Sequence, residues 1–297
     1  MGDSGGGGSV SGGGGSGSGG SGTKYTNVVW LGGSYAPPTI AHFGIAKAVG
    51  ALISDRGGRG AVCIVPISKK YPKASVSEAC APGDVRLELV TAMVEALNAD
   101  PEKPKNIDFI LEDYEYRDMR PGGVPTVDSL PMLADRYPGA TIYFAQGQDS
   151  IASLFQKKWV RSDKLLEMLS ATYELILFPR DSDKGHAIKG SIGTPDAIVE
   201  RIMERIHIVP ASVTSTASSS AIRKALRKGD AAEELFHPAV YAKFQEIQRT
   251  RPAIYTSPDC DPPASKGGAR KTVYKRKSTK RRHKKTHKRR SQRRMKM

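Results

Sequence analysis

The sequence has few cysteines and no long apolar run. Its three cysteines, Cys63, Cys80 and Cys260, form no CxxC pair, so we expect neither a disulfide framework nor a zinc site. Such sparse cysteine usage is typical of a reducing compartment. No stretch approaches the roughly 18 apolar residues of a membrane span, and the N-terminus lacks the charged and apolar regions of a signal peptide. We therefore expect an intracellular protein with no membrane contact.

Excess positive charge is confined to one end of the chain. The formal net charge of the 297 residues is +16, yet residues 266–297 alone carry 17 of the 46 Lys and Arg and no acidic residue. The remainder is close to neutral, with 29 basic against 30 acidic residues. At the other end, residues 1–22 hold 13 of the 31 glycines, a composition typical of a flexible arm. We predict a disordered arm at 1–22, one folded domain at 23–251, and a linker with a disordered basic tail at 252–297.

Short β-branched runs alternate with amphipathic stretches throughout the central region. This alternation predicts an α/β fold, a Rossmann-like doubly wound parallel sheet in a single domain. The predicted strands are 27–31, 61–67, 107–111, 141–145, 173–178 and 207–209. The predicted helices are 40–54, 84–98, 129–136, 150–155 with 164–170, 195–205, 218–228 and 237–248. In such sheets ligands bind beyond the carboxyl ends of the strands, so the loops there are the candidate site.

The loop after the first predicted strand lacks both the G-x-G-x-x-G spacing of dinucleotide-binding dehydrogenases and the lysine of a P-loop. It contains Gly32 and Gly33, and Thr39 is a good N-cap for the helix that follows. Backbone N–H groups of this first turn, together with His42, could bind a phosphate. Taken alone, a histidine at this position is more often a surface or capping residue.

Residues 33–42, GSYAPPTIAH, resemble the G-[ST]-F-x-P-x-[HT]-x-x-H signature of the nucleotidyltransferase superfamily. The resemblance implies that the residues of this loop contact the phosphates of ATP and that His42 stabilises charge as pyrophosphate leaves. The residues it assigns to the ATP phosphates are Gly33, Ser34, Tyr35 and Thr39. Tyr35 stands where the signature has Phe, and Ala36 replaces a common Asn or Asp.

Three later blocks resemble nicotinamide and nicotinic acid mononucleotide adenylyltransferases. A Tyr-x-Lys segment ends in Lys73, which the resemblance places at the mononucleotide phosphate. The Tyr114-Glu pair stands where the family has Trp-Glu, and the G-x-D…W block at 147–159 assigns Gly147 and Asp149 to ribose and Trp159 to the pyridine ring. Each has a plain alternative: a solvated lysine, an exposed loop tyrosine, and a tryptophan that packs in the core.

The last block, SSSAIRKALRKG at 218–229, resembles the second superfamily signature, I-S-S-T-x-[IV]-R-x-x-[LI]-R. It assigns Ser219, Ser220 and Ile222 to the ATP phosphates and makes Arg223 a second catalytic residue beside His42. A capped surface helix would look similar. We also expect Arg86 to be mainly structural, and Arg180, at the end of the fifth predicted strand, to be structural or to line the site.

The resemblance spans about residues 28–247 and implies adenylyl transfer from ATP to nicotinamide or nicotinic acid mononucleotide. Mg²⁺ would be held by the ATP phosphates, without a metal site made by the protein. Two other readings stay open: a phosphopantetheine or cytidylyl transferase, and a nucleic-acid-binding protein that keeps an inactive transferase scaffold. The tail at 266–297 is similar to segments that bind nucleic acid or an import receptor. This similarity suggests that the protein is in the nucleus; without it, we would expect the cytoplasm. A homo-oligomer is compatible with the sequence.

Overall fold

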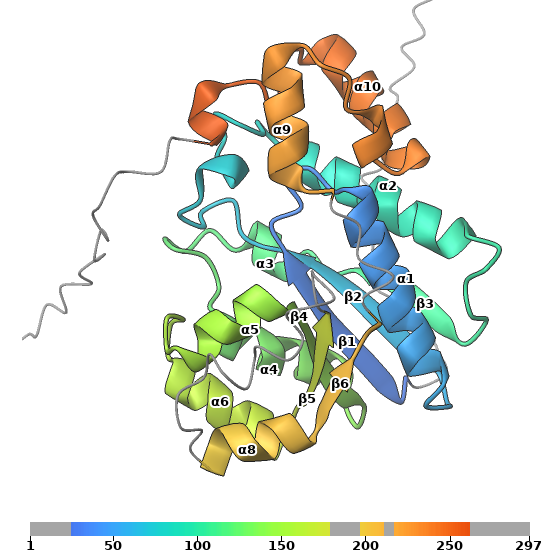
Figure 1. The fold of residues 1–297 in the computed structure, drawn as a ribbon, viewed down its shortest axis with the longest axis vertical. Helices are drawn as coiled ribbons and strands as arrows, with labels where there is room; N and C mark the ends of the chain where they lie inside the picture. Colours follow the sequence, from blue (N-terminus) through green and yellow to red (C-terminus); the bar gives the residue numbers. More distant parts are fainter. Residues whose placement is uncertain (1–24, 179–196, 211–216, 262–297) are drawn as a thin grey trace, which may run out of the picture. The chain divides into compact units, whose positions relative to one another are not determined.

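The computed structural model describes residues 25–178, 197–210 and 217–261 of the chain. Its centre is a six-stranded sheet of order β3-β2-β1-β4-β5-β6, in which every neighbouring pair is parallel (Figure 1). The strands are β1 Asn27–Gly33, β2 Gly60–Pro66, β3 Ile107–Leu111, β4 Thr141–Gly147, β5 Glu174–Phe178 and β6 Ile206–Ile208. The Rossmann-like, doubly wound sheet predicted from the sequence is thereby confirmed.

Helices cover both faces of the sheet because its strands are apolar on both sides. Val29 and Leu31 of β1 belong to one core, and Val28 and Trp30 belong to the other. The first core is completed by α1 Ile40–Ser54, α2 Val85–Ala99, α9 Ser219–Lys228 and α10 Pro238–Thr250. The second is completed by α4 Thr126–Arg136, α5 Gln148–Phe155, α6 Ser162–Ala171 and α8 Ala197–Glu204. Helix α10 packs along α2 (Figure 1).

Strand order reverses between β1 and β4, which pair in parallel register. In doubly wound sheets a ligand binds at such a reversal, beyond the carboxyl ends of the strands. The segments that follow β1 and β4 are residues 34–39 and helix α5. The fold therefore places the first loop and the G-x-D block at one crevice.

The helix ends follow local sequence signals. Thr39 caps α1, and Ser218 caps α9 by accepting from the N–H of Ala221. Gly229 ends α9 with φ +75°, a left-handed conformation that glycine adopts without steric cost. His237 caps α10, with Pro238 at its first position. Among the described residues, no helix is both long and apolar enough to cross a membrane.

Two segments fold where the sequence predicts a loop or a linker. A short helix, α3 Tyr114–Arg117, lies where we predicted only a loop. The folded domain also continues past the predicted boundary at residue 251. The chain runs through turns and the 3₁₀ helix η4 Pro258–Cys260, burying Ile254 and Tyr255 in the first core. We call residues 252–261 the strap.

A disulfide joins Cys80 to Cys260, so the expectation that the cysteines form no disulfide is wrong. The two residues are 180 positions apart, a separation that gives no local spacing signal. Their pairing depends on the strap folding back onto the loop before α2. The third cysteine, Cys63, is a buried free thiol on β2. Burial raises its pKa, so Cys63 is an unreactive core residue.

Candidate functional site

The first loop is organised by a capping box at the start of α1. Thr39 Oγ1 accepts from the backbone N–H of His42, and the backbone N–H of Thr39 donates to His42 Nδ1 at 3.1 Å. An N–H can only donate, so Nδ1 is an acceptor and the neutral imidazole carries its hydrogen on Nε2. The cap therefore fixes His42 as a donor through Nε2. Thr39 itself is buried.

Tyr35 holds the first loop from the side of the first core. Its side chain is buried, its hydroxyl donates to the carbonyl of Leu31 at 2.8 Å, and its ring lies 5.0 Å from that of His42. Its φ of +42° is unusual for a residue with a side chain. Tyr35 thus packs its ring in the first core, next to His42, and its hydroxyl holds the loop to β1.

The start of α9 contacts this same loop from the far end of the sequence. Ser219 Oγ donates to the carbonyl of Pro37 at 2.8 Å, and Arg223 Nη1 donates to the carbonyl of Ala36. The two segments are more than 180 residues apart in the chain. The two blocks that the sequence identifies separately are therefore one structural unit, with Ile222 buried in the core behind it.

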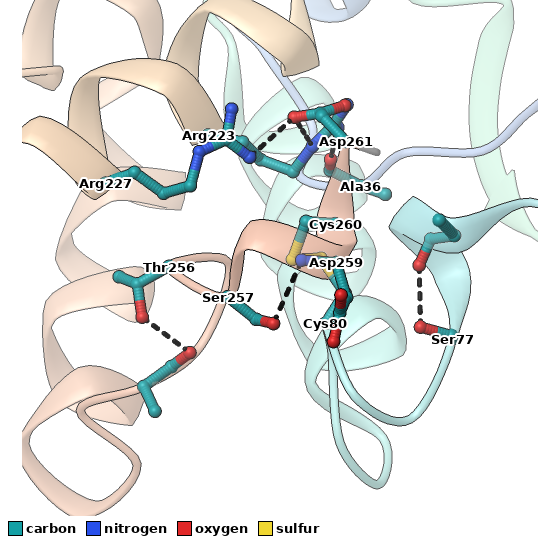
Figure 2. The surroundings of a disulfide bond; sticks show 12 residues. Ala36, Ser77, Cys80, Arg223, Arg227, Thr256, Ser257, Asp259, Cys260 and Asp261 are labelled. Atoms are coloured by element: carbon teal, nitrogen blue, oxygen red, sulfur yellow. Dashed lines mark hydrogen bonds and ion pairs between the residues drawn. A yellow bond between two sulfur atoms is a disulfide. The ribbon is translucent and has the colours of Figure 1, made fainter. Parts of the chain in front are cut away.

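Arg223 lies within this unit and is only 3% exposed. Its Nη2 also donates to Ser220 Oγ at 3.0 Å, which orients the guanidinium. The Nε and Nη2 edge of the guanidinium faces the carboxylate of Asp261, with Nε to Oδ2 at 2.9 Å (Figure 2). No sequence signal points to Asp261, because it lies in the strap, a segment that the sequence predicts to be part of a linker.

A cavity of about 360 Å³ opens next to the first loop. Its lining comes from segments that follow β1, β2, β3 and β4. The lining includes aromatic residues (Trp30, Tyr71, Trp159), cations (Lys73, Lys158), glycines (Gly32, Gly33) and the polar residues Ser34, Glu115, Thr126 and Gln146. This volume and mixture are typical of small-molecule sites. The cavity could hold a flat ring together with an anionic group.

Two tryptophans shape the cavity. Trp159 lies on it while its Nε1 donates to Ser153 Oγ at 2.7 Å, so it both packs on the core and faces the site. Phe144 stands between the two indoles, 5.2 Å from Trp30 and 6.2 Å from Trp159 between ring centroids. A side chain at Gly32 would overlap the Trp30 ring, so glycine is required there.

A buried polar network lies next to the cavity and includes one of its lining residues, Glu115. Ser129 Oγ donates to Glu115 and accepts from the indole Nε1 of Trp30 at 2.9 Å. Glu115 is 2% exposed, and burial raises its pKa to about 7, while the Ser129 hydrogen bond partly opposes the shift. From the sequence, Glu115 is only one half of the Tyr-Glu pair, with no predicted role. Its place in the first turn after β3 was the available signal.

Tyr114 does not line the cavity. It is 8% exposed and packs in the second core, where its hydroxyl contacts Ser129 and the Arg136 guanidinium lies 5.0 Å from its ring centroid. The expected stacking of Tyr114 on a pyridine ring is therefore not what the structure favours. The reason is α3, which turns Tyr114 inward and Glu115 toward the cavity.

The other predicted residues differ in their relation to the cavity. Gly147 and Asp149 lie one and three residues after Gln146, which lines it, but they are not lining residues themselves; Asp149 is exposed in the first turn of α5. Lys73 Nζ donates to Ser34 Oγ at 3.1 Å, which links the second loop to the first. Arg180 lies outside the described residues.

Arg86 connects the first two loops from within. It is 1% exposed, and it donates to the carbonyl of Ser34 at 2.9 Å and to that of Ile67 at 2.6 Å. Both contacts are to backbone, as expected for a structural role. Arg86 thereby holds together the loop after β1 and the loop after β2, both of which line the cavity.

The sequence profile of the cytidylyltransferase-like family matches residues 30–225, about two thirds of the chain. This protein belongs to the cytidylyltransferase-like family. The match includes both the first loop and the start of α9. It ends at residue 225, within α9 and before the strap.

Several relatives share one name. A probable nicotinate-nucleotide adenylyltransferase of Rubrobacter xylanophilus is 31% identical over 144 residues, which cover 48% of this chain and 59% of that protein. The Geobacter sulfurreducens protein of the same name is 32% identical over 124 residues, or 42% of this chain and 50% of the relative. The matches thus span between half and about six tenths of these relatives.

Among solved structures, the chain is similar to Plasmodium falciparum nicotinic acid mononucleotide adenylyltransferase complexed with APC. The TM-score is 0.52 at 20% identity, covering 75% of this chain and 96% of that one. The same enzyme complexed with NaAD gives a TM-score of 0.51 at 19% identity, covering 75% and 97%. At this identity the likeness establishes the cytidylyltransferase-like fold.

Proposed function

We propose that this cytidylyltransferase-like protein transfers the adenylyl group of ATP to nicotinic acid or nicotinamide mononucleotide. The products would be deamido-NAD or NAD, with pyrophosphate. The observation that carries the proposal is the union of the first loop with the start of α9, beside an aromatic cavity at the strand reversal. One side suits a polyphosphate and the other a flat ring with its own phosphate.

On the phosphate side, the chain offers donors and positive charge at fixed positions. His42 Nε2–H and the guanidinium of Arg223 would stabilise the charge that develops on the α-phosphate and on the leaving pyrophosphate. Thr39 would orient His42 through the capping box, and Ser220 would orient Arg223. Adenylyl transfer needs little covalent chemistry from the protein, so positioning and preorganised charge would supply most of the rate.

On the cavity side, Trp159 would stack on the pyridine ring and Lys73 would neutralise the mononucleotide phosphate. Asp149, in the first turn of α5, would accept hydrogen bonds from ribose hydroxyls, with Gly147 at the end of β4 allowing close approach. The link from Lys73 to Ser34 would bring the acceptor phosphate toward the first loop. That arrangement is what in-line attack on the α-phosphorus requires.

We propose that Mg²⁺ enters with ATP, held by phosphate oxygens, and supplies charge neutralisation there. The donor set of the first loop and α9 is hydroxyl, imidazole and guanidinium, which suits phosphate oxygens better than a cation. Within the described parts of the chain, no three His, Cys, Asp or Glu side chains cluster as metal ligands would.

Between the two acceptors, we favour nicotinic acid mononucleotide, since the relatives reported above are named for nicotinate. An acceptor panel tests the proposal. Purified protein with Mg-ATP is given nicotinic acid mononucleotide, nicotinamide mononucleotide or phosphopantetheine, and in a separate reaction Mg-CTP with phosphocholine. We expect pyrophosphate with the pyridine mononucleotides and a higher kcat/KM for the nicotinate form. Release only with phosphopantetheine or phosphocholine would assign another transferase of the family.

We propose a separate role for residues 266–297, as a segment that binds polyanions or an import receptor and directs the protein to the nucleus. The support is their charge, 17 Lys and Arg without an acidic residue. A fusion of residues 262–297 to a fluorescent protein is expected to concentrate in the nucleus. Uniform distribution of the fusion would contradict this role.

A further inference from the structure

The carboxylate of Asp261 occupies the edge of Arg223 that a phosphate would use. Nε and Nη2 of Arg223 donate to its two oxygens, with Nε to Oδ2 at 2.9 Å, and Arg227 Nη1 donates to Oδ2 at 3.0 Å (Figure 2). This is the fork geometry in which arginine binds both carboxylates and phosphates. The remaining Arg223 contacts are to Ala36 and Ser220, inside the proposed phosphate site.

Asp261 is ionised at neutral pH, because the hydrogen bond from Arg223 lowers the pKa of its carboxyl group. A negative charge at this place opposes the approach of a triphosphate in two ways. It repels the incoming phosphate, and it neutralises the two arginines that would attract it. ATP would therefore have to displace Asp261 before Arg223 could act on its phosphates.

A covalent bond holds Asp261 in place. The preceding residue, Cys260, forms the disulfide with Cys80, and the N–H of Tyr255 donates to the carbonyl of Cys80 at 2.9 Å. Figure 2 shows the disulfide directly beside the ion pair of Asp261 with Arg223. The loop that carries Cys80 lies between Lys73 and α2, so both anchors of the strap belong to the domain that holds the site.

We propose that the strap is a redox-dependent autoinhibitory segment. Closed by the Cys80–Cys260 disulfide, it places Asp261 where an ATP phosphate would bind; reduced, it releases Arg223 for ATP. The inference rests on the proposed function, because it takes Arg223 as a ligand of the triphosphate.

The opening step is a thiol–disulfide exchange with a dithiol reductant. One thiolate of the reductant attacks a sulfur of the Cys80–Cys260 bond, which breaks and leaves a mixed disulfide. The second thiolate then closes the reductant into its own disulfide. In balance, the reductant loses two electrons and two protons, and Cys80 and Cys260 each become thiols. Both sulfurs are buried, so exchange requires local opening of the strap.

The closed strap carries internal costs that favour release once the covalent bond is gone. Tyr255 has φ +59°, a left-handed conformation that is unfavourable for a residue with a side chain. Its hydroxyl is buried and finds no hydrogen-bond partner among the described residues. Burial of the rings and aliphatic groups of the strap opposes these costs. The Cys80–Cys260 disulfide also opposes these costs, by keeping the strap attached to the loop before α2.

The test compares oxidised and fully reduced protein in ATP affinity, measured by calorimetry, and in kcat/KM for ATP. Thiol titration follows the reduction, from one thiol to three, because the chain has three cysteines and one disulfide. We expect reduction to lower the Kd and KM for ATP about tenfold, the order expected when a charged hydrogen-bonding competitor is removed. Cys260→Ser should behave as the reduced protein under both conditions.

Asp261→Asn tests the same point without breaking the disulfide. It keeps the shape of the side chain and removes its charge, so oxidised Asp261→Asn should bind ATP about as tightly as reduced wild type. Asp259→Asn is the matched control, because Asp259 lies two residues earlier in the strap, is exposed, and makes no contact with Arg223 in Figure 2. Oxidised Asp259→Asn should keep the low affinity of oxidised wild type.

Each outcome decides for or against the strap. Equal ATP affinity of oxidised, reduced and Asp261→Asn protein would overturn the proposal. Weaker ATP binding in Asp261→Asn would also overturn it, and would make Asp261 a positioning residue for Arg223. If ATP affinity rises on reduction but neither mononucleotide yields pyrophosphate, the strap stands and the proposed reaction fails. If Cys260→Ser does not fold, the Asp261→Asn comparison decides.

Discussion

The phosphate side and the aromatic cavity are neighbours that differ in how much open space their side chains face. On the phosphate side, Arg223 is held by Asp261, Ala36 and Ser220, and His42 is held by Thr39. In the cavity, by contrast, Trp159 and Lys73 keep exposed surface on an open space of about 360 Å³. The cavity is preformed, whereas the phosphate side is preformed and also occupied by an acidic side chain of the same chain.

This difference separates two kinds of control. In the proposed reaction, residues of the cavity would set which acceptor binds; they come from the ends of β1 and β4 and from the segments after β1, β2, β3 and β4. Residues of the phosphate side would set whether ATP can be used; they come from the first loop, α9 and the strap. Substitutions on the two sides should therefore change different kinetic constants.

The largest effect is expected on the phosphate side, from His42→Ala. Loss of a preorganised donor at a developing charge typically lowers kcat by about 10²–10³-fold. Affinity for the mononucleotide, measured by quenching of tryptophan fluorescence, should stay within about twofold. A thermal melt checks that loss of the His42 side of the capping box, at most about 1 kcal/mol, has not unfolded the variant. A kcat within threefold of wild type would remove His42 from the mechanism.

The next effect concerns Glu115 next to the cavity. Its folded-state pKa of about 7 lies above the ordinary value of 4.5, so its contribution to stability is complete below pH 4.5 and is lost as pH rises through 7. The shift corresponds to roughly 3 kcal/mol. Urea unfolding between pH 4.5 and 8 should show this fall in the free energy of unfolding, and Glu115→Gln should remove it. Equal pH slopes for the two proteins would contradict the assignment.

A smaller effect is expected from Trp159→Ala in the cavity. Loss of ring stacking should raise the KM for the mononucleotide about tenfold or somewhat more, because stacking of a base on an aromatic ring is worth about 1–3 kcal/mol. The KM for ATP should hardly change, which is the opposite of the pattern expected for the strap. Equal increases in both KM values would show that the two sides are not separate.

The smallest effect is expected from ending the chain after residue 265. This removes the basic segment and leaves the strap, Cys260 and Asp261 in place. Thermal stability and kcat/KM should remain within about twofold, while retention on a heparin column should fall strongly. A loss of turnover would show that residues 266–297 contribute to the site.

The sequence alone predicted most of the fold because its periodicity is local. The strand at 107–111 and the helix at 40–54 have the predicted bounds, since Thr39, β-branched runs and amphipathic spacing act over a few residues. The first loop and the start of α9 were also identifiable, as each is a contiguous block. Their contact through Ala36 and Pro37 became visible only with the fold.

What the sequence did not predict depends on distant pairs. Cys80 and Cys260 carry no spacing signal, and the strap resembles a polar linker apart from Ile254 and Tyr255. The inward turn of Tyr114 and the position of Glu115 next to the cavity follow from the four-residue helix α3, too short to show a period. The role of Asp261 depends on its contact with Arg223 of α9, a residue distant in the sequence.

The most direct test of the central claim is product formation by fully reduced protein with Mg-ATP and nicotinic acid mononucleotide. Chromatography of the reaction should show deamido-NAD and pyrophosphate appearing in equal amounts, at a rate that His42→Ala lowers at least a hundredfold. Absence of any dinucleotide with nicotinic acid mononucleotide and with nicotinamide mononucleotide, in both reduced and oxidised protein, would contradict the account.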